Sequence, residues 1–312
     1  MLLELTVIRV AWTFNFDFAH YLLAGVIWML GVCMVLLATV VWLPTTVIAA
    51  FGLTVIFAQN IAGVVAQALP EWAARFLYFG GVFTIGDDGP AVAVLYSIVP
   101  WIGVMATGYA FGAIMIRPAD VRDRLCLRIG MVATALFLVV GSIGVFLQPA
   151  PPGAPSVLFR LLNQQKYPAS QLFLLMTLGP TIALLRRASL GSPSSLGASA
   201  WQAGAICGRI GDVLAVFGRV PLFYYLLHIP LIHAAAVVVS LAREGRVNPW
   251  LFGNHPMMPP PVPDGYRWSL PLLYLVFALV VAILYIACRW WAQRKTRRQD
   301  VPPLMTRSSA GR

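Results

Sequence analysis

The sequence predicts an all-α fold, a polytopic bundle of transmembrane helices. The chain is 60% hydrophobic but only 11% charged, whereas a soluble domain typically carries about 25% charged residues. Its mean hydropathy is +0.81. Apolar stretches of membrane-spanning length recur along the chain, and a spanning helix needs about 20 mainly apolar residues. We therefore expect an integral membrane protein that contacts lipid over much of its surface.

Seven segments are long and apolar enough to cross a bilayer as helices. They are residues 21–43, 45–66, 91–115, 129–147, 170–185, 219–242 and 269–288. Residues 1–11 read as the second half of a further helix, so we expect about seven full membrane helices plus a partial N-terminal one. We interpret residues 1–298 as a single transmembrane domain, N-terminally incomplete, and residues 299–312 as a cytoplasmic tail.

The basic residues predict the orientation, because cytoplasmic loops are enriched in Lys and Arg. One set of connections, residues 117–128, 186–219 and 289–312, is the richer in these bases. We therefore expect a cytoplasmic C-terminus and a location in a bacterial plasma (inner) membrane, with membrane lipids as partners. The net charge of +11 is then a topology signal. No nucleic-acid partner is expected, since no aromatic-interleaved basic patch accompanies the charge.

The segment Arg219–His233, RVPLFYYLLHIPLIH, places two histidines in an otherwise apolar stretch. Ionisable residues at membrane depth usually face a bundle interior or a water-filled pocket. His228 and His233 are the candidate catalytic residues, since histidine acts as acid, base or acyl carrier near neutral pH. The alternative is a helix kinked at Pro230, whose histidines bond to neighbours.

Arg219 stands at the start of that segment and is the candidate for binding an anionic donor such as coenzyme A. Guanidinium groups match phosphate oxygens in geometry. For the other arginines on the predicted cytoplasmic side, topology and contact with anionic lipid are the stronger interpretation.

Two polar stretches on the predicted outer side are candidates for binding an acceptor. Residues 12–18, WTFNFDF, alternate with period two, which predicts an extended piece with Asn15 and Asp17 on one side. Residues 163–168, NQQKYP, supply Asn163, Lys166 and Tyr167, whose groups suit hydrogen bonding to a polyhydroxylated or amino acceptor. The alternative for both stretches is a belt of interfacial aromatic and Lys anchors.

The remaining motifs predict structure rather than chemistry. Asp87 and Asp88 lie in a Gly-flanked turn, and Gly108 and Gly112 form a GxxxG, a weak packing signal that leaves an oligomer possible. No disulfide framework and no metal site are expected. The four cysteines fall in predicted helices and cytoplasmic loops: Cys33, Cys126, Cys207 and Cys288.

Four blocks in order resemble the heparan-alpha-glucosaminide N-acetyltransferase-like family of polytopic membrane acyltransferases. They are LLELTVIRVAWTFNFDF, YSIVPWIGVMATGYAFG, NQQKYPASQLFLLMTLGPTIALL and FGRVPLFYYLLHIPLIH. The resemblance implies that an acetyl group passes from cytoplasmic acetyl-CoA, across the bilayer, to an acceptor outside. That acceptor is a small molecule or a glycan with an amino or hydroxyl group.

The chain also departs from the family pattern. Family members usually begin with an Asp-Ala-Leu-Arg-Gly-like stretch followed by the histidine held to be essential, and this chain has no such stretch. We therefore expect an incomplete N-terminus and leave open whether this chain is active alone, with His228 the residue expected nearest the reacting centre. The alternatives are a permease or flippase, which would move substrate without consuming acyl-CoA, and a non-catalytic membrane scaffold.

Overall fold

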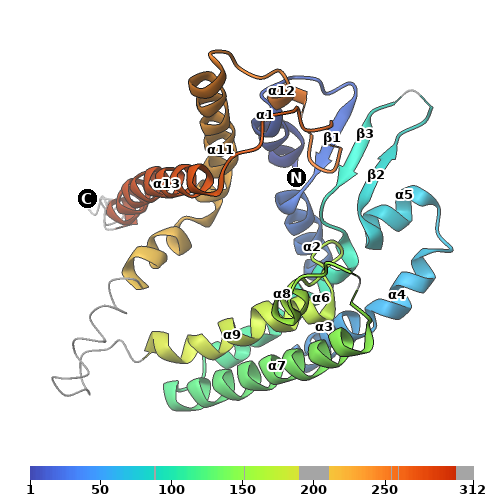
Figure 1. Ribbon diagram of the computed structural model, residues 1–312. Coiled ribbons are helices and arrows are strands. Elements are labelled where there is room, and N and C mark those ends of the chain that lie inside the picture. The colour runs from blue at the N-terminus through green and yellow to red at the C-terminus, as the bar shows by residue number, and fades with distance from the viewer. Residues whose placement is uncertain (88, 151, 190–210, 254, 259, 300–312) are drawn as a thin grey trace, which may run out of the picture. The chain divides into compact units, whose positions relative to one another are not determined.

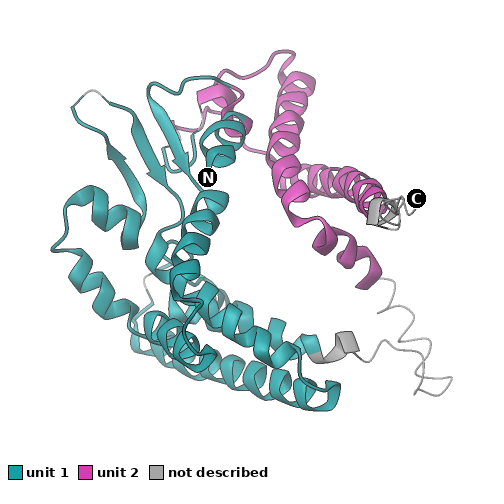
Figure 2. Ribbon diagram, turned by 180° about the vertical axis from the view of Figure 1, so that it is seen from behind, with its two compact units in different colours: residues 1–10, 15–194, 255–259 teal, residues 11–14, 195–254, 260–312 magenta. Residues whose placement is uncertain are grey.

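The computed structural model describes residues 1–312 except 88, 151, 190–210, 254, 259 and 300–312. Asp88 and Cys207 therefore lie outside the described residues, as does the predicted tail apart from its first residue, Gln299. The chain divides into two compact units (Figure 2). Unit 1 comprises residues 1–10, 15–194 and 255–259, and unit 2 comprises residues 11–14, 195–254 and 260–312.

The structure is mainly helical, as the composition predicts (Figure 1). Within the part of the chain that the structure describes, four helices are long and apolar enough to cross a membrane: α6 (Ile98–Met115), α7 (Ala119–Leu147), α11 (Pro221–Glu244) and the part Leu270–Lys295 of α13 (Leu270–Gln299). Helices α3 (Thr45–Phe57) and α4 (Gln59–Ala66) add a fifth if their 65° bend lies within one span. Helices α2 (Val26–Val40) and α9 (Gln171–Ser189) have shorter apolar parts. An integral membrane protein is supported, whereas the predicted count of seven full spans is not confirmed.

A three-stranded sheet in unit 1 corrects the all-α prediction. Strands β1 (Tyr21–Ala24), β3 (Ala91–Val94) and β2 (Gly81–Thr84) lie in that order (Figure 1). β1 runs parallel to β3, and β2 runs antiparallel to β3. The predicted spans 21–43 and 91–115 therefore begin as strands and become helical only at Val26 and Ile98. Short apolar runs such as YLLA and AVAV fit a buried strand as well as a helix start, so periodicity cannot separate the two.

The N-terminal residues are helical to Thr13 and then irregular. They form a π-helical turn, Glu4–Ile8, and α1 (Arg9–Thr13). The prediction of an extended piece over residues 12–18 is therefore wrong for Trp12 and Thr13, which are helical, for Phe14, whose φ is 50°, and for Phe18, which lies in a turn. Short helical pieces elsewhere are α5 (Glu71–Ala74), the π-helical turn Arg75–Phe79, α8 (Val157–Leu162) and α12 (Trp250–Gly253).

Glycines allow two pairs of helices in unit 1 to approach closely. A Cβ on Gly179 of α9 would lie 2.8 Å from the backbone nitrogen of Thr134 in α7, and one on Gly52 of α3 would lie 2.7 Å from that of Thr107 in α6. Small residues at such crossings are typical of membrane helix packing. Gly108 and Gly112 take no part in these crossings, since a Cβ on either would meet nothing within 4 Å.

Unit 2 is built around α11 and α13. Pro221 occupies the first turn of α11, where its missing N–H costs nothing, and Pro230 lies inside the helix as predicted. Gly245 ends α11 in the left-handed conformation (φ 66°), and its N–H donates to the Leu241 carbonyl. A core centred on Val216, Val220, Cys288 and Ala292 joins α11, α13 and the helix over residues 211–219.

Candidate functional site

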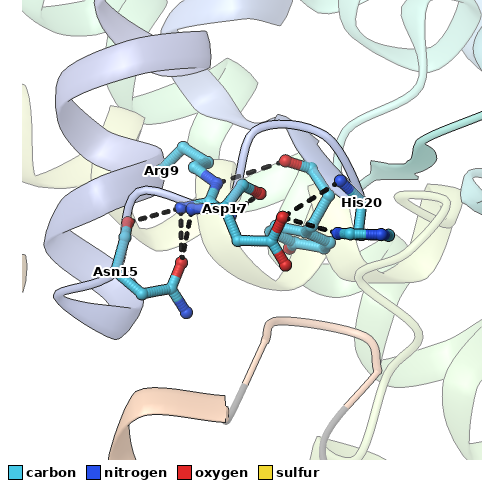
Figure 3. Close-up of polar contacts among 5 residues, drawn as sticks. Arg9, Asn15, Asp17 and His20 are labelled. Carbon is cyan, nitrogen blue, oxygen red and sulfur yellow. Dashed lines mark hydrogen bonds and ion pairs between the residues drawn. The ribbon is translucent and has the colours of Figure 1, made fainter.

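Arg9 organises the loop that contains two of the predicted acceptor residues (Figure 3). Its side chain is fully buried. Nε donates to the Tyr21 carbonyl at 3.2 Å, and one terminal nitrogen donates to the carbonyl and side-chain oxygens of Asn15 at 2.5 and 2.7 Å. The other terminal nitrogen donates to the Asp17 carbonyl. The guanidinium therefore holds residues 15–21 in place, and we call Arg9, Asn15, Asp17, His20, Tyr21 and His255 the Arg9 cluster.

The side chains of Asn15 and Asp17 have partners within this cluster. The Asp17 carboxylate lies 2.7 Å from Nδ1 of His20 and also accepts from the His20 backbone N–H at 3.2 Å (Figure 3). The hydrogen bond to His20 lowers the pKa of the Asp17 carboxyl. The structure thus brings Asn15 and Asp17 together around Arg9, and their visible role is to shape the loop.

His255 completes the cluster from a distant part of the chain. Its ring centroid lies 4.0 Å from that of Tyr21, whose hydroxyl donates to the Pro256 carbonyl at 3.1 Å. Among the described residues, buried Nδ1 of His255 has no hydrogen-bond partner. Burial lowers the pKa of His255, and the Arg9 charge lowers it further against the opposing effect of Asp17.

Two other predicted acceptor residues line a cavity of about 190 Å³ in unit 1, which we call the Lys166 pocket. Its walls come from the Arg75–Phe79 turn, the β2 and β3 strands, the start of α6 and the loop before α9. The polar, aromatic and thioether side chains that face it include Arg75, Ser97, Trp101, Lys166, Tyr167 and Met257. Asn163 is exposed and is not among the lining residues, so the structure separates it from Lys166 and Tyr167.

Two tyrosines surround the Lys166 ammonium. The hydroxyls of Tyr96 and Tyr167 lie 3.3 Å apart, and the ammonium is 5.7 and 5.1 Å from their ring centroids. Burial lowers the pKa of Lys166, but hydrogen bonds to Tyr167 and Tyr96 more than offset this, so the pKa is raised overall. Lys166 is therefore a cation at neutral pH.

His228 is fixed by its own helix. Its Nδ1 lies 2.6 Å from the Tyr225 carbonyl, and its ring stacks on Tyr224 with centroids 5.2 Å apart. A carbonyl only accepts, so in the neutral ring Nδ1 carries the proton and Nε2 offers a lone pair. In this tautomer the basic nitrogen available to a substrate is Nε2.

His233 has a different environment. It is 8% exposed, its ring centroid lies 4.1 Å from that of Phe14, and it forms a hydrogen bond with the Trp12 backbone. Its Nε2 is buried with no hydrogen-bond partner among the described residues. These contacts suit a packed core histidine better than one that meets a substrate.

Arg219 lines a larger cavity of about 700 Å³ within unit 2, which we call the Arg219 pocket. Arg294 and Lys295, from the end of α13, face the same cavity. Phe223 and Trp291 stack in its wall with ring centroids 5.1 Å apart and planes 8° apart. Three cations beside two aromatic rings form a site suited to an anionic ligand that carries a flat ring.

Several of these residues were not predicted. Arg9 carried a signal, since an arginine in an apolar stretch is costly unless it has partners. Arg294 and Lys295 had been interpreted only as topology signals. His255 carried no local signal, because its partner Tyr21 lies more than 200 residues away in the sequence. Among the described residues, no three His, Cys, Asp or Glu side chains gather as metal ligands.

Comparison with known families gives a match over nearly half of the chain. Residues 3–148 match the family model described as heparan-alpha-glucosaminide N-acetyltransferase, catalytic. This stretch includes the Arg9 cluster except His255, and the part of the Lys166 pocket formed by residues 75–101. Searches of curated proteins and of solved structures gave no match.

Proposed function

We propose that the chain is a membrane acetyltransferase that uses acetyl-CoA, because residues 3–148 match the family model described as heparan-alpha-glucosaminide N-acetyltransferase, catalytic. The acetyl group passes to an amino or hydroxyl group of a glycan-like acceptor. Beyond the family match, the observation that carries the donor assignment is the clustering of three cations and an aromatic pair around one cavity.

The Arg219 pocket supplies what the donor requires. The phosphates of coenzyme A are strongly anionic, and Arg219, Arg294 and Lys295 place positive charge on the cavity wall. The rings of Phe223 and Trp291 offer an apolar face to a nucleobase. A volume of about 700 Å³ lies within the range of about 300–1,000 Å³ for small-molecule sites. The bias of basic residues supports donor entry from the cytoplasmic side.

Acyl transfer needs a nucleophile and a base. The nitrogen or oxygen lone pair of the acceptor attacks the thioester carbonyl carbon, the C–S bond breaks, and coenzyme A leaves as a thiol after gaining a proton. We assign the removal of the acceptor proton to His228, whose Nε2 lone pair is set by the Nδ1 contact with Tyr225. The same nitrogen can alternatively carry the acetyl group for one step.

The Lys166 pocket is the proposed acceptor site. Lys166 and Tyr167 offer an ammonium and a phenol to the hydroxyl or charged groups of a glycan. Asn15 and Asp17, whose groups are engaged around Arg9 and His20, serve the acceptor indirectly by shaping the loop. His233 is assigned a packing role.

The first experiment measures acetyl-CoA binding by isothermal titration calorimetry on the purified chain in nanodiscs. Arg219→Gln is expected to weaken binding about 10- to 100-fold, the effect of losing a charge-assisted hydrogen bond. Arg124→Gln is the matched control, since Arg124 is exposed and pairs with Asp120 outside the pocket. Equal affinity in wild type and Arg219→Gln would rule out this donor site.

A second assay follows acetyl transfer to an amino sugar with radiolabelled donor. His228→Ala is expected to bind the donor as wild type does and to lose turnover by at least 100-fold. Donor binding is scored separately, so a loss of turnover is not confused with a loss of folding. Full turnover in His228→Ala would overturn the assignment of this histidine.

A further inference from the structure

The start of α6 lacks the usual side-chain cap. Ser97 occupies the N-cap position with extended backbone, but its hydroxyl makes no cap hydrogen bond. A serine there normally accepts from the backbone N–H of the second or third helical residue. The third residue here is Pro100, which has no N–H to give. The Ser97 side chain is 2% exposed, and its Oγ has no hydrogen-bond partner among the described residues.

The pocket that Ser97 lines carries positive charge. Ser97 lines the Lys166 pocket together with Arg75 and Lys166, and no Asp or Glu is found among the described residues that line it. Glu71 lies nearby and pairs with Arg75 at 2.9 Å, so it offsets part of that charge, but the Glu71 carboxylate is largely exposed. Tyr96 and Tyr167, which contact Lys166, are phenols rather than carboxylates. Lys166 therefore supplies the main uncompensated charge.

The helix end adds to this field. The first N–H groups of any α-helix have no partner within the helix, and its N-terminus carries a partial positive charge. At the start of α6 these donors lie next to the orphan Ser97 hydroxyl and the two cations. A buried unpaired hydroxyl is costly, and an acceptor that bears negative charge would satisfy all these groups together.

We propose that the Lys166 pocket binds an oxyanion, a carboxylate, sulfate or phosphate group, through Ser97, Lys166 and the N-terminus of α6, with Arg75 as a second cation. The cavity of about 190 Å³ is smaller than a typical site for a whole ligand, so it takes the anionic end of a larger molecule or a free ion. This binding is independent of acetyl transfer. We also infer that the anionic group belongs to the acetyl acceptor, and this second inference rests on the proposed function.

The test uses inorganic sulfate and the full chain in phosphatidylcholine nanodiscs, without acetyl-CoA. Sulfate is titrated against chloride at constant ionic strength, and the midpoint of thermal unfolding is recorded. Wild type is expected to show a saturable rise, because a ligand that binds only the folded state stabilises it. Ser97→Ala and Lys166→Met are expected to raise the apparent Kd at least fivefold, whereas Arg124→Gln leaves it unchanged.

Ser97→Ala removes a single oxygen, so it guards against a Lys166 variant that fails to fold. The absence of a saturable rise in wild type, or an unchanged Kd in both pocket variants, would overturn the proposal. Repeating the titration in phosphatidylglycerol nanodiscs identifies the source of the anion. If the apparent sulfate affinity is weaker in phosphatidylglycerol than in phosphatidylcholine, and Ser97→Ala shows no such difference, the site is assigned to a lipid headgroup. An affinity that is the same in both lipids assigns it to a non-lipid anion. Because no donor is present, the result does not depend on whether acetyl transfer occurs.

Discussion

The N-termini of α2 and α6 both lie in unit 1 and meet the same electrostatic need in different ways. At α2 the carboxylate of Glu4, 1% exposed, accepts from the Ile27 N–H at 2.8 Å. At α6 the corresponding position faces a cavity, and Ser97 leaves its hydroxyl unpaired. One helix end is satisfied by a carboxyl group that belongs to the chain, and the other lies beside Arg75 and Lys166, with no Asp or Glu among the described residues that line its pocket.

The contact of Glu4 at the start of α2 stabilises the fold, whereas the pocket at the start of α6 is suited to binding a ligand. Close packing reinforces the contact at the start of α2, because a Cβ on Gly25 would collide with the Glu4 carboxyl group. The start of α6 retains the unsatisfied Ser97 hydroxyl and an open cavity, and such features cost stability and persist at functional sites. The contrast predicts that changes at α2 affect folding, whereas changes at α6 affect ligand binding.

The largest effect is expected at the α2 end. Glu4→Ala removes the buried carboxylate and leaves the Ile27 N–H without its acceptor, which should cost about 2 kcal/mol of unfolding free energy. Glu4→Gln, which keeps a side-chain oxygen able to accept from the Ile27 N–H, should cost about half as much. Denaturant unfolding in detergent micelles measures both, and a change within about 0.5 kcal/mol in Glu4→Ala would contradict the structural role.

At the α6 end, Ser97→Asp would give that helix an anion of its own. An Asp at the N-cap is favourable at a helix N-terminus, and the Lys166 charge lies in the same pocket, so we expect a gain of about 1 kcal/mol. The same variant should lose the stabilisation by sulfate, because the carboxylate takes its place. Thermal unfolding with and without sulfate tests both effects, and a variant that keeps the full sulfate response would argue against a shared position.

The α6 end is also expected to respond to pH through the segment 255–258, since Met257 lines the pocket and His255 packs on Tyr21. Burial lowers the folded-state pKa of His255 below its ordinary 6.5. Below pH 6.5 the unfolded chain therefore binds a proton that the folded chain excludes, and stability falls as pH drops through this window. His255→Phe should flatten the decline between pH 6.5 and 5, as measured by unfolding midpoints. An equally steep decline in that variant would remove His255 as its cause.

The smallest effect on folding is expected from Lys166→Met. The side chain is exposed and its phenol contacts are replaceable, so the unfolding free energy should change by less than about 1 kcal/mol. Sulfate affinity should nevertheless fall, which would separate binding from stability at a single residue. A loss as large as that of Glu4→Ala would instead make Lys166 a structural residue.

Local sequence patterns predict the helices better than the sheet. Apolar length was sufficient for α6, α7, α11 and α13, because a membrane span is a property of one continuous segment. The strands at residues 21–24 and 91–94 could not be predicted, since each is four apolar residues long and pairs with a partner far along the chain. The GxxxG at residues 108–112 also failed to mark a helix crossing, whereas Gly52 and Gly179 do mark crossings without any motif.

The candidate sites also contain residues that can be recognised locally in the sequence and residues that join the site only through the fold. Chemistry readable from residue type led to Lys166, Tyr167 and Arg219, and each lines a cavity, while their roles remain predictions. Residues that join a site through the fold were not predictable: Ser97 looks like an ordinary helix cap until Pro100 and the pocket are seen together. Arg9 could be recognised as unusual, but its partners in the loop could not.

The parallel pairing of β1 with β3 imposes an order on how the protein is made. Tyr21 pairs with Ala91, roughly 70 residues later, and α2, α3 and α4 lie between them. At a synthesis rate of about 5–20 residues per second, the first strand waits about 4–14 seconds for its partner. During that interval the parallel pairing with β3 cannot form, so the sheet can close only after the intervening residues have been synthesised.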